Sequence, residues 1–352
     1  MRGAIARCSE PFETSEVKMP SPAAARGRPI FIVGSGRSGS TILTWCLGQH
    51  PNIIPQEESN WLGPFAIDAA VAFQRGSARG ERGQLSSNFV QRDEFLARFG
   101  QTINELMLSH RRQFEDLDRR QTAGWYPPPF KISRSPEEPK LRWVDGTPEY
   151  SFYIYGLRKL FPEARFVHLV RDVTDVVRSL LNFLPEGRDR LVANEQAAYE
   201  YWLRRATCCF EAEQAYGPNV VCRMRYSDLA ERSESAMRSL VGFLGEPYTR
   251  ECLEPLAKRI NSANVPANFD PTDPETDPAI VEQARQLSDL LKSAPQQPEP
   301  SAEIAKKLEA EFSQRVEYFY DLSAKYSDAQ QLIARLQEEC ALLNVAPLAG
   351  KR

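Results

Sequence analysis

The sequence predicts an α/β protein of three layers, in which helices cover both faces of a central parallel sheet. Three observations support this class. The apolar run 30–33 leads through a glycine-rich loop into a helical pattern, and the apolar run 166–170 also leads directly into a helix. A third run, 141–145, is followed by a helix-start signal at Thr147. Strands that alternate with helices at this spacing form parallel sheets.

The loop after the first strand has the composition of an anion site. Glycines let the backbone turn so that successive N–H groups converge, and the following helix directs its positive end at the same point. Ser40 stands where the nucleotide-triphosphatase loop GxxxxGK[ST] has its lysine, so the loop suits one compact anionic group better than a triphosphate with magnesium. The loop's glycines and side-chain donors are Gly34, Gly36, Gly39, Arg37, Ser38, Ser40 and Thr41.

A polar segment over 61–140 is predicted to be a helical insert between two strands of the sheet. An amphipathic helix is expected from Asp93 onward, because apolar residues recur there at helical spacing. The aromatic and proline cluster 125–130 suits either the wall of an acceptor pocket or a packed loop. After the insert, a strand ends at Asp145, and Thr147 with Pro148 opens a helix.

The segment 157–183 predicts helix, turn, buried strand and helix. Pro162 ends the first helix, and Asp172 opens the second. Arg171 then lies at the carboxyl end of the strand, and Ser179 lies about 12 Å further along the helix axis. Ligands of open α/β sheets gather at the carboxyl ends of strands, so this pair and the glycine loop are expected side by side. A guanidinium and a hydroxyl at these positions can together bind one phosphate.

The remaining elements are a long helix over 194–216, a strand from Val220, and a helix over 235–244 that stops at Gly245. The stretch 266–300 is rich in proline and acidic residues, which predicts an extended segment. Residues 301–345 return to a helical pattern with an apolar stripe. This stripe can pack on the main domain, cap an acceptor site, or pair with a second subunit in a homodimer.

The GRSGST loop resembles the 5′-phosphosulfate loop of sulfotransferases that use 3′-phosphoadenosine 5′-phosphosulfate (PAPS). The chain is most similar to the branch with tyrosylprotein and bacterial sulfotransferases, in which an HP pair and an acidic pair follow the first helix, as at 50–51 and 57–58. Arg171 and Ser179 match the family's 3′-phosphate motif, and RYSDL at 225–229 resembles its RYEDL. The resemblance implies a P-loop-like fold, PAPS as co-substrate, no metal, and in-line sulfuryl transfer to a hydroxyl acceptor with release of PAP. The cofactor-binding residues that it implies are Gly36, Arg37, Ser38, Gly39, Ser40, Thr41, Arg171, Ser179 and Tyr226.

The resemblance also implies catalytic roles, for Glu58 as general base and for Arg37, with Glu57 as the alternative base. The chain departs from the family at Gly146, where related sequences place a lysine before the TP pair that neutralises the leaving phosphate. Lys131 and Lys140 are the candidate substitutes. Two other function classes stay open. A catalytically idle PAP-binding or scaffold protein would explain Gly146, whereas a nucleotide phosphotransferase would need the missing loop lysine.

Composition bounds the partners and the location. The chain has 352 residues with a net charge of −3, from 44 basic and 47 acidic residues, so no global field indicates a nucleic-acid partner. Its seven cysteines lack CxxC spacing, which favours buried reduced thiols. We expect no membrane span and no signal peptide, and hence a cytoplasmic, bacterial enzyme. The expected organisation is a disordered tail at 1–28, a sulfotransferase domain at 29–265 with its acceptor side in the insert 61–140, the extended segment 266–300 and the C-terminal helical segment 301–345.

Overall fold

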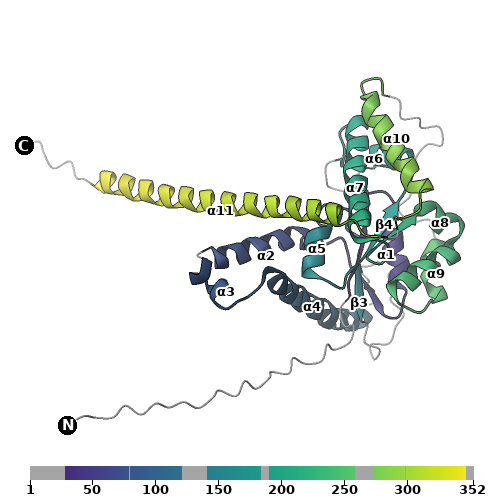
Figure 1. The fold of residues 1–352 in the computed structure, drawn as a ribbon, viewed down its shortest axis with the longest axis horizontal. Coiled ribbons are helices and arrows are strands. Elements are labelled where there is room, and N and C mark those ends of the chain that lie inside the picture. Colours follow the sequence, from purple (N-terminus) through teal and green to yellow (C-terminus); the bar gives the residue numbers. More distant parts are fainter. Residues whose placement is uncertain are drawn as a thin grey trace, which may run out of the picture.

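A computed structural model of the chain describes residues 28–78, 80–120, 141–183, 190–257, 273–297 and 299–345. Its centre is a five-stranded sheet in the order β2-β3-β1-β4-β5, with every neighbouring pair parallel (Figure 1). The strands are β1 (Ile30–Val33), β2 (Ile53–Pro55), β3 (Arg142–Asp145), β4 (Arg165–Val170) and β5 (Val221–Arg225). The predicted class, with its central parallel sheet, is confirmed.

Helices cover both faces of this sheet (Figure 1). One face packs on α2, α4, α5, α7 and α11, and the other on α1, α8 and α9, while α10 and α6 pack beside them on α7. The α-helices are α1 (Ser40–Gly48), α2 (Leu62–Ser77), α3 (Gln84–Ser87), α4 (Arg92–Arg120), α5 (Ile154–Leu160), α6 (Val173–Leu181), α7 (Glu195–Tyr216), α8 (Tyr226–Glu231), α9 (Ser233–Leu244), α10 (Pro278–Ser293) and α11 (Ala302–Val345). Short 3-10 helices are η1 (Gly80–Arg82), η3 (Pro148–Phe152) and η4 (Arg250–Ala257).

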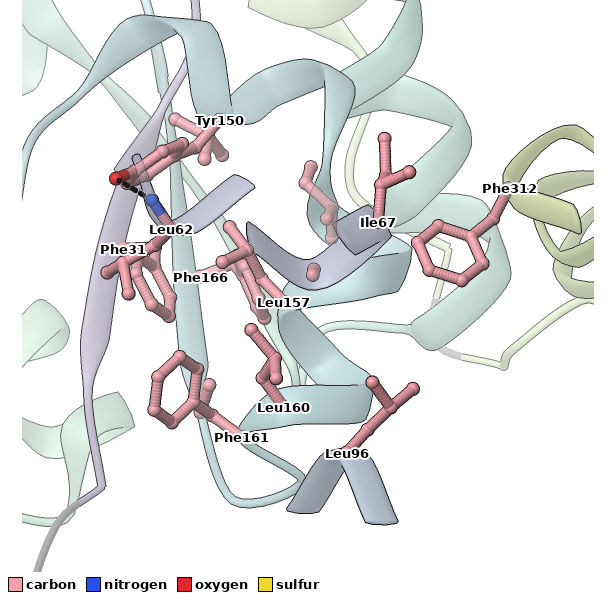
Figure 2. Close-up of a cluster of buried hydrophobic side chains, with 14 of the residues drawn as sticks. Phe31, Leu62, Ile67, Leu96, Tyr150, Leu157, Leu160, Phe161, Phe166 and Phe312 are labelled. Atoms are coloured by element: carbon pink, nitrogen blue, oxygen red, sulfur yellow. Dashed lines mark hydrogen bonds between the residues drawn. The ribbon is translucent and has the colours of Figure 1, made fainter. Parts of the chain in front are cut away.

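An aromatic cluster joins the helical insert and the C-terminal helix to the sheet (Figure 2). Its centre is Phe31 on β1, whose ring lies 5.4 Å from Trp143 and 5.3 Å from Phe166 on the neighbouring strands. Leu62 of α2 and Phe312 of α11 belong to the same buried cluster. Because the insert shares this core, the elements that surround the sheet's carboxyl edge are held in fixed positions.

Two expectations about local structure are corrected, and one strand was missed. The extended segment 266–300 contains the helix α10, in which Ala284 and Leu291 are fully buried. Pro278 lies in the first turn of α10 and Asp277 caps it, so the proline content marks a helix start there rather than an extended chain. The helix expected after Thr147 is a 3-10 helix, η3. The short strand β2 was not predicted at all, since three residues are too few to show a period.

The helix α11 is docked at one end and exposed at the other. Phe312 and Val316 are each 5 % exposed, and Arg315 Nη1 donates a hydrogen bond to Phe152 O at 2.6 Å. Beyond them the helix projects away from the body of the molecule, and Phe319 and Leu322 are 42 % and 46 % exposed (Figure 1). The first turns of the expected stripe therefore pack on the chain's own domain, whereas the later ones do not.

Candidate functional site

Each strand of the sheet is followed at its carboxyl end by a predicted site residue or, after β3, by Gly146, where the chain departs from the family. The register pairs Val33 with His168 and Val170 with Arg225, so neighbouring strands end at one edge. The residues that follow the strands at this edge are the glycine loop after β1, Glu57 and Glu58 after β2, Gly146 after β3, Arg171 after β4 and Tyr226 after β5. The edge is where ligands of open α/β sheets bind.

The glycine loop contacts Ser151 of η3 at its start and the aromatic ring of Tyr226 at its end. Gly34 N–H donates to Ser151 Oγ at 3.0 Å, and Ser151 Oγ donates to Pro148 O at 2.6 Å. Gly39 has φ 103°, and a Cβ atom there would lie 2.7 Å from the ring of Tyr226. Only glycine fits this position, because the backbone is left-handed and the ring occupies the side-chain space.

The glycine loop and the second predicted anion site are in direct contact. Arg37 Nε donates to Ser179 Oγ at 3.1 Å, and Arg171 Nη1 donates to Arg37 O at 3.0 Å. The guanidinium of Arg171 lies 4.8 Å from the centre of the Tyr226 ring. Arg37 itself lies 4.1 Å from the ring centre of Phe183, a contact that the sequence did not suggest. The structure thus brings together the residues predicted for the two ends of one nucleotide.

The electrostatics of this region suit an anionic ligand. Burial lowers the pKa of Arg37, the nearby positive charge of Arg171 lowers it further, and Glu58 acts in the opposite direction. The hydroxyl of Ser38 is buried, with 1 % of the residue exposed, and has no hydrogen-bond partner among the described residues. An unpaired buried hydroxyl costs free energy, and an oxyanion in the loop would accept its hydrogen bond. The residues present therefore fit a phosphosulfate group.

The acidic turn that carries Glu57 and Glu58 is fixed by a buried polar network. Ser59 Oγ donates to Asp145 Oδ2 at 2.8 Å, and Ser59 N–H donates to Thr147 Oγ1 at 2.9 Å. One turn later, Leu62 N–H donates to the hydroxyl of Tyr150 at 3.1 Å (Figure 2). Burial raises the pKa of Asp145, although its hydrogen bonds with Thr147 and Ser59 oppose the shift. The network positions the acidic turn against the end of β3.

A cavity of about 550 Å³ lies between the glycine loop's helix and the helical insert. Glu57 and Glu58 line it from the acidic turn, Thr41 from α1, and Met107 from α4. Its apolar and aromatic lining is Trp45, Pro55, Trp61, Leu62 and Trp143, and the other lining residues are Thr44, Gln56, Ser59, Asp145 and Gly146. The insert therefore forms one side of the cavity that the candidate base faces.

The space that a side chain at position 146 would need is occupied by Thr44 of α1. A Cβ atom at Gly146 would lie 2.4 Å from Thr44 Oγ1. Thr44 is 5 % exposed, and its hydroxyl has no hydrogen-bond partner among the described residues. Any side chain at position 146, the family's lysine included, would have to displace Thr44. Lys131, Lys140 and the aromatic cluster 125–130 lie outside the described residues.

A second cluster, which the sequence did not assign, supports the glycine loop from α7. A Cβ atom at Gly36 would lie 2.7 Å from the hydroxyl of Tyr201. Arg205 Nη2 donates to Glu149 Oε1 at 3.1 Å, and its guanidinium stacks 3.4 Å from the centre of the Tyr201 ring. Burial is the largest cause that raises the pKa of Tyr201, to about 12. In the sequence, this cluster is indicated only by the segment TPEY at 147–150, which contains Glu149, and by Tyr201 and Arg205, which lie four residues apart on one helix.

A family model described as the sulfotransferase family matches residues 29–250, which is more than half of the chain. The chain belongs to the sulfotransferase family. The family predicted from the glycine loop and from Arg171 with Ser179 is thereby confirmed. None of the described helices is both long and apolar enough to cross a membrane.

Known relatives are distant. A protein of Mycobacterium tuberculosis named omega-hydroxy-beta-dihydromenaquinone-9 sulfotransferase Stf3 is 25 % identical over 251 residues, which cover 62 % of either chain. The match thus spans less than two thirds of that relative's length. A solved sulfotransferase domain from the Synechococcus PCC 7002 olefin synthase is 19 % identical, with a TM-score of 0.40, over 85 % of this sulfotransferase-family chain and 96 % of that one. A solved Mycobacterium avium sulfotransferase, STF9, also has a TM-score of 0.40, with 17 % identity over 79 % of each chain.

Proposed function

We propose that this chain transfers the sulfuryl group of PAPS to an acceptor hydroxyl and releases PAP. The observation that carries the proposal is the contact between the glycine loop and the Arg171–Ser179 pair, through Arg37. Two anion sites this close match a nucleotide that is anionic at both its 5′ and 3′ ends. A triphosphate nucleotide would leave the second site empty. The chain also lacks the loop lysine that would bind the triphosphate, which disfavours phosphotransfer.

In this proposal the glycine loop holds the 5′-phosphosulfate through its N–H groups, Ser38, Ser40 and Thr41. Arg171 and Ser179 hold the 3′-phosphate, and Tyr226 covers the nucleotide next to them. PAPS supplies an activated sulfuryl group. The bond between the acceptor oxygen and sulfur forms while the bond from sulfur to the bridging phosphate oxygen breaks, and PAP leaves with the bonding electrons. Arg37 stabilises the charge that develops on the leaving phosphate, a role in which no lysine at position 146 assists.

Glu58 accepts the proton of the acceptor hydroxyl. It is an exposed carboxylate that lines the cavity, and its charge acts on both Arg37 and Tyr201. Glu57 lines the same cavity and is the alternative base. The network of Ser59, Asp145 and Thr147 fixes the turn on which both carboxylates stand.

The cavity favours an acceptor with an apolar body. Trp45, Trp61, Met107 and Trp143 contribute apolar or aromatic surface, and the carboxylates beside them disfavour an acceptor whose hydroxyl is next to an anionic group. Among tyrosine peptides, sugars, lipids and small phenols, we therefore propose a phenol or a lipid alcohol. The relative named for a hydroxylated menaquinone agrees with this choice. The bacterial source of that relative also supports the bacterial origin that we propose.

Calorimetry with PAP and with ATP-Mg tests the nucleotide, and ³⁵S-labelled PAPS with a panel of acceptors tests the reaction. We expect PAP to bind at least tenfold tighter than ATP-Mg, and label to enter phenols or lipid alcohols before sugars. Tighter binding of ATP-Mg would refute the proposal in favour of a phosphotransferase. Bound PAP with no transfer to any acceptor would instead establish an idle PAP-binding protein.

Replacing Glu58 by glutamine separates catalysis from binding. We expect Glu58→Gln to lower turnover by about 100-fold or more, the usual scale for a positioned base, with PAP affinity unchanged. Glu57→Gln is the matched control, and it should retain most of the turnover. If the two variants exchange these outcomes, Glu57 is the base, and if neither loses turnover, the acidic turn has no catalytic role.

A further inference from the structure

The projecting part of α11 carries a long exposed apolar stripe. Large apolar side chains that are at least two-fifths exposed follow one another along it: Phe319 at 42 %, Leu322 at 46 %, Tyr326 at 65 %, Ile333 at 53 % and Leu336 at 50 %. Contiguous exposed apolar surface on this scale marks an interaction site. The anchored end of the same helix, at Phe312 and Val316, fixes the direction in which the stripe projects.

The stripe has the period of a coiled coil. Its positions are 319, 322, 326, 329, 333, 336 and 340, which are separated alternately by three and four residues. A mean spacing of 3.5 residues keeps one seam of a helix facing a partner helix along its length. The earlier, docked part of α11 departs from this spacing, because Leu308, Phe312 and Val316, which pack on the core, follow one another at two successive intervals of four. The change of period coincides with the point where the helix leaves the domain.

We propose that residues 319–340 pair with the same segment of a second copy of this chain, as an antiparallel coiled coil. In the antiparallel register centred on residue 331, Ala329 faces Ile333 of the second copy and Tyr326 faces Leu336 of the second copy. Each layer then sets a smaller side chain against a larger one. A parallel pair would instead place Ala329 against its own copy and leave a gap there.

Charge supports the same register. The first core positions of the heptads are 319, 326, 333 and 340, so the residues that precede them are 318, 325, 332 and 339. In an antiparallel coiled coil these preceding residues of the two helices lie opposite one another. In the register centred on residue 331, Lys325 faces Glu339 of the second copy, twice by symmetry, and Leu332, which is 55 % exposed, faces its own copy. In a parallel pair Lys325 would face Gln330, and this ion pair would be lost.

The two domains fit at opposite ends of such a pair. From Val316, the last buried residue of α11, to the centre at residue 331 is 15 residues, or about 22 Å of helix, and Tyr320 packs partly on the same core. The two anchored ends are therefore about 45 Å apart along the axis, so each domain lies beyond the end of the other copy's helix. The candidate sulfotransferase site is unaffected, because its residues come from the sheet edge and the insert.

Site-directed cross-linking tests both the partner and its direction. Both experiments use the full chain with Cys8→Ser. We expect sedimentation to show a dimer. We also expect a short bismaleimide to join Leu322→Cys to the exposed native Cys340 of the second copy. Cys340 alone should not cross-link, since its two copies are about 27 Å apart in this register. Leu322→Cys with Cys340→Ser is the matched control and should stay uncross-linked. A monomer at tens of micromolar, or a dimer cross-linked through Cys340 alone, overturns the proposal.

Charge reversal provides an independent measurement that does not disturb the core. Lys325→Glu should raise the dimer dissociation constant by about tenfold, because two attractive contacts become repulsive. Lys325→Glu combined with Glu339→Lys should restore the affinity of the unmodified chain. If the double variant is no tighter than the single one, the two residues do not face each other, and the register is refuted.

Discussion

Gly146→Ala tests whether Thr44 occupies the space of the family's lysine. The added Cβ atom would lie 2.4 Å from Thr44 Oγ1, far inside van der Waals contact, and Thr44 is nearly buried on α1. Overpacking of this kind costs about 1–3 kcal/mol. At roughly 2–4 °C per kcal/mol, the melting temperature should fall by about 2–12 °C. PAP affinity should fall with it, since α1 begins at the glycine loop.

A second substitution at Thr44 distinguishes this clash from a general intolerance of Gly146. Thr44→Ala removes the atom that the new Cβ meets, so the Gly146→Ala/Thr44→Ala variant should recover most of the lost melting temperature. In the Gly146→Ala background, Thr44→Val keeps an atom at that place and is the matched control, which should leave the loss in place. Differential scanning calorimetry of the four variants and the unmodified chain measures the coupling. Strictly additive effects, or an unchanged melting temperature in Gly146→Ala, would show that Thr44 does not restrict position 146.

Three further outcomes are expected. Met107→Ala shortens the apolar wall that α4 gives to the cavity, so the acceptor KM should rise about tenfold while the PAP dissociation constant is unchanged; a change in PAP binding alone would contradict the acceptor assignment. Gly39→Ala should weaken PAP at least tenfold, because it strains a left-handed residue and displaces Tyr226; an unchanged PAP affinity would argue against the loop. Glu213 of α7 is 4 % exposed and accepts a hydrogen bond from Arg223 Nε at 2.9 Å, so Glu213→Gln should destabilise the fold by about 3–5 kcal/mol near neutral pH. Burial raises the pKa of Glu213, but hydrogen bonds and charges from His168 and Arg223 outweigh it and lower the pKa, so this stability is present above about pH 4.5 and is lost as pH falls through the folded pKa. The difference in melting temperature between the unmodified chain and Glu213→Gln should shrink as the pH falls. A difference that is independent of pH would contradict a role for the Glu213 charge in stability.

The sequence predicted those parts of the fold and the site that depend on local chemistry. The glycine loop, the strand before Arg171 and the αL stop at Gly245 each follow from residues close together in the chain. Arg171, Ser179 and Tyr226 could also be expected near the loop, because parallel strands place their carboxyl ends at one edge. The roles assigned to these residues, and the acceptor side of the insert, stay predictions.

What the sequence did not predict depends on long-range packing. The network from Ser59 to Asp145 joins residues 86 positions apart, and neither residue has a local pattern that indicates the other. The contact of Gly146 with Thr44 depends on how closely α1 approaches β3. The helix α10 was hidden by its proline-rich flanks, although its apolar residues recur at helical spacing. Cys340 is exposed, against the expectation of buried thiols, because it lies on the projecting helix.

The proposed sulfuryl transfer requires the second anion site, and the binding of two nucleotides to one variant is its decisive test. PAP and adenosine 5′-phosphosulfate are titrated into the unmodified chain and Arg171→Ala, with the exposed Arg238→Ala as a control for net charge. Because only PAP carries the 3′-phosphate, Arg171→Ala should weaken PAP by about 10–100-fold, the scale of a lost charged hydrogen bond, and should leave adenosine 5′-phosphosulfate within about twofold. Equal losses of affinity for the two nucleotides, or no loss for PAP, would contradict the proposal that Arg171 binds the 3′-phosphate.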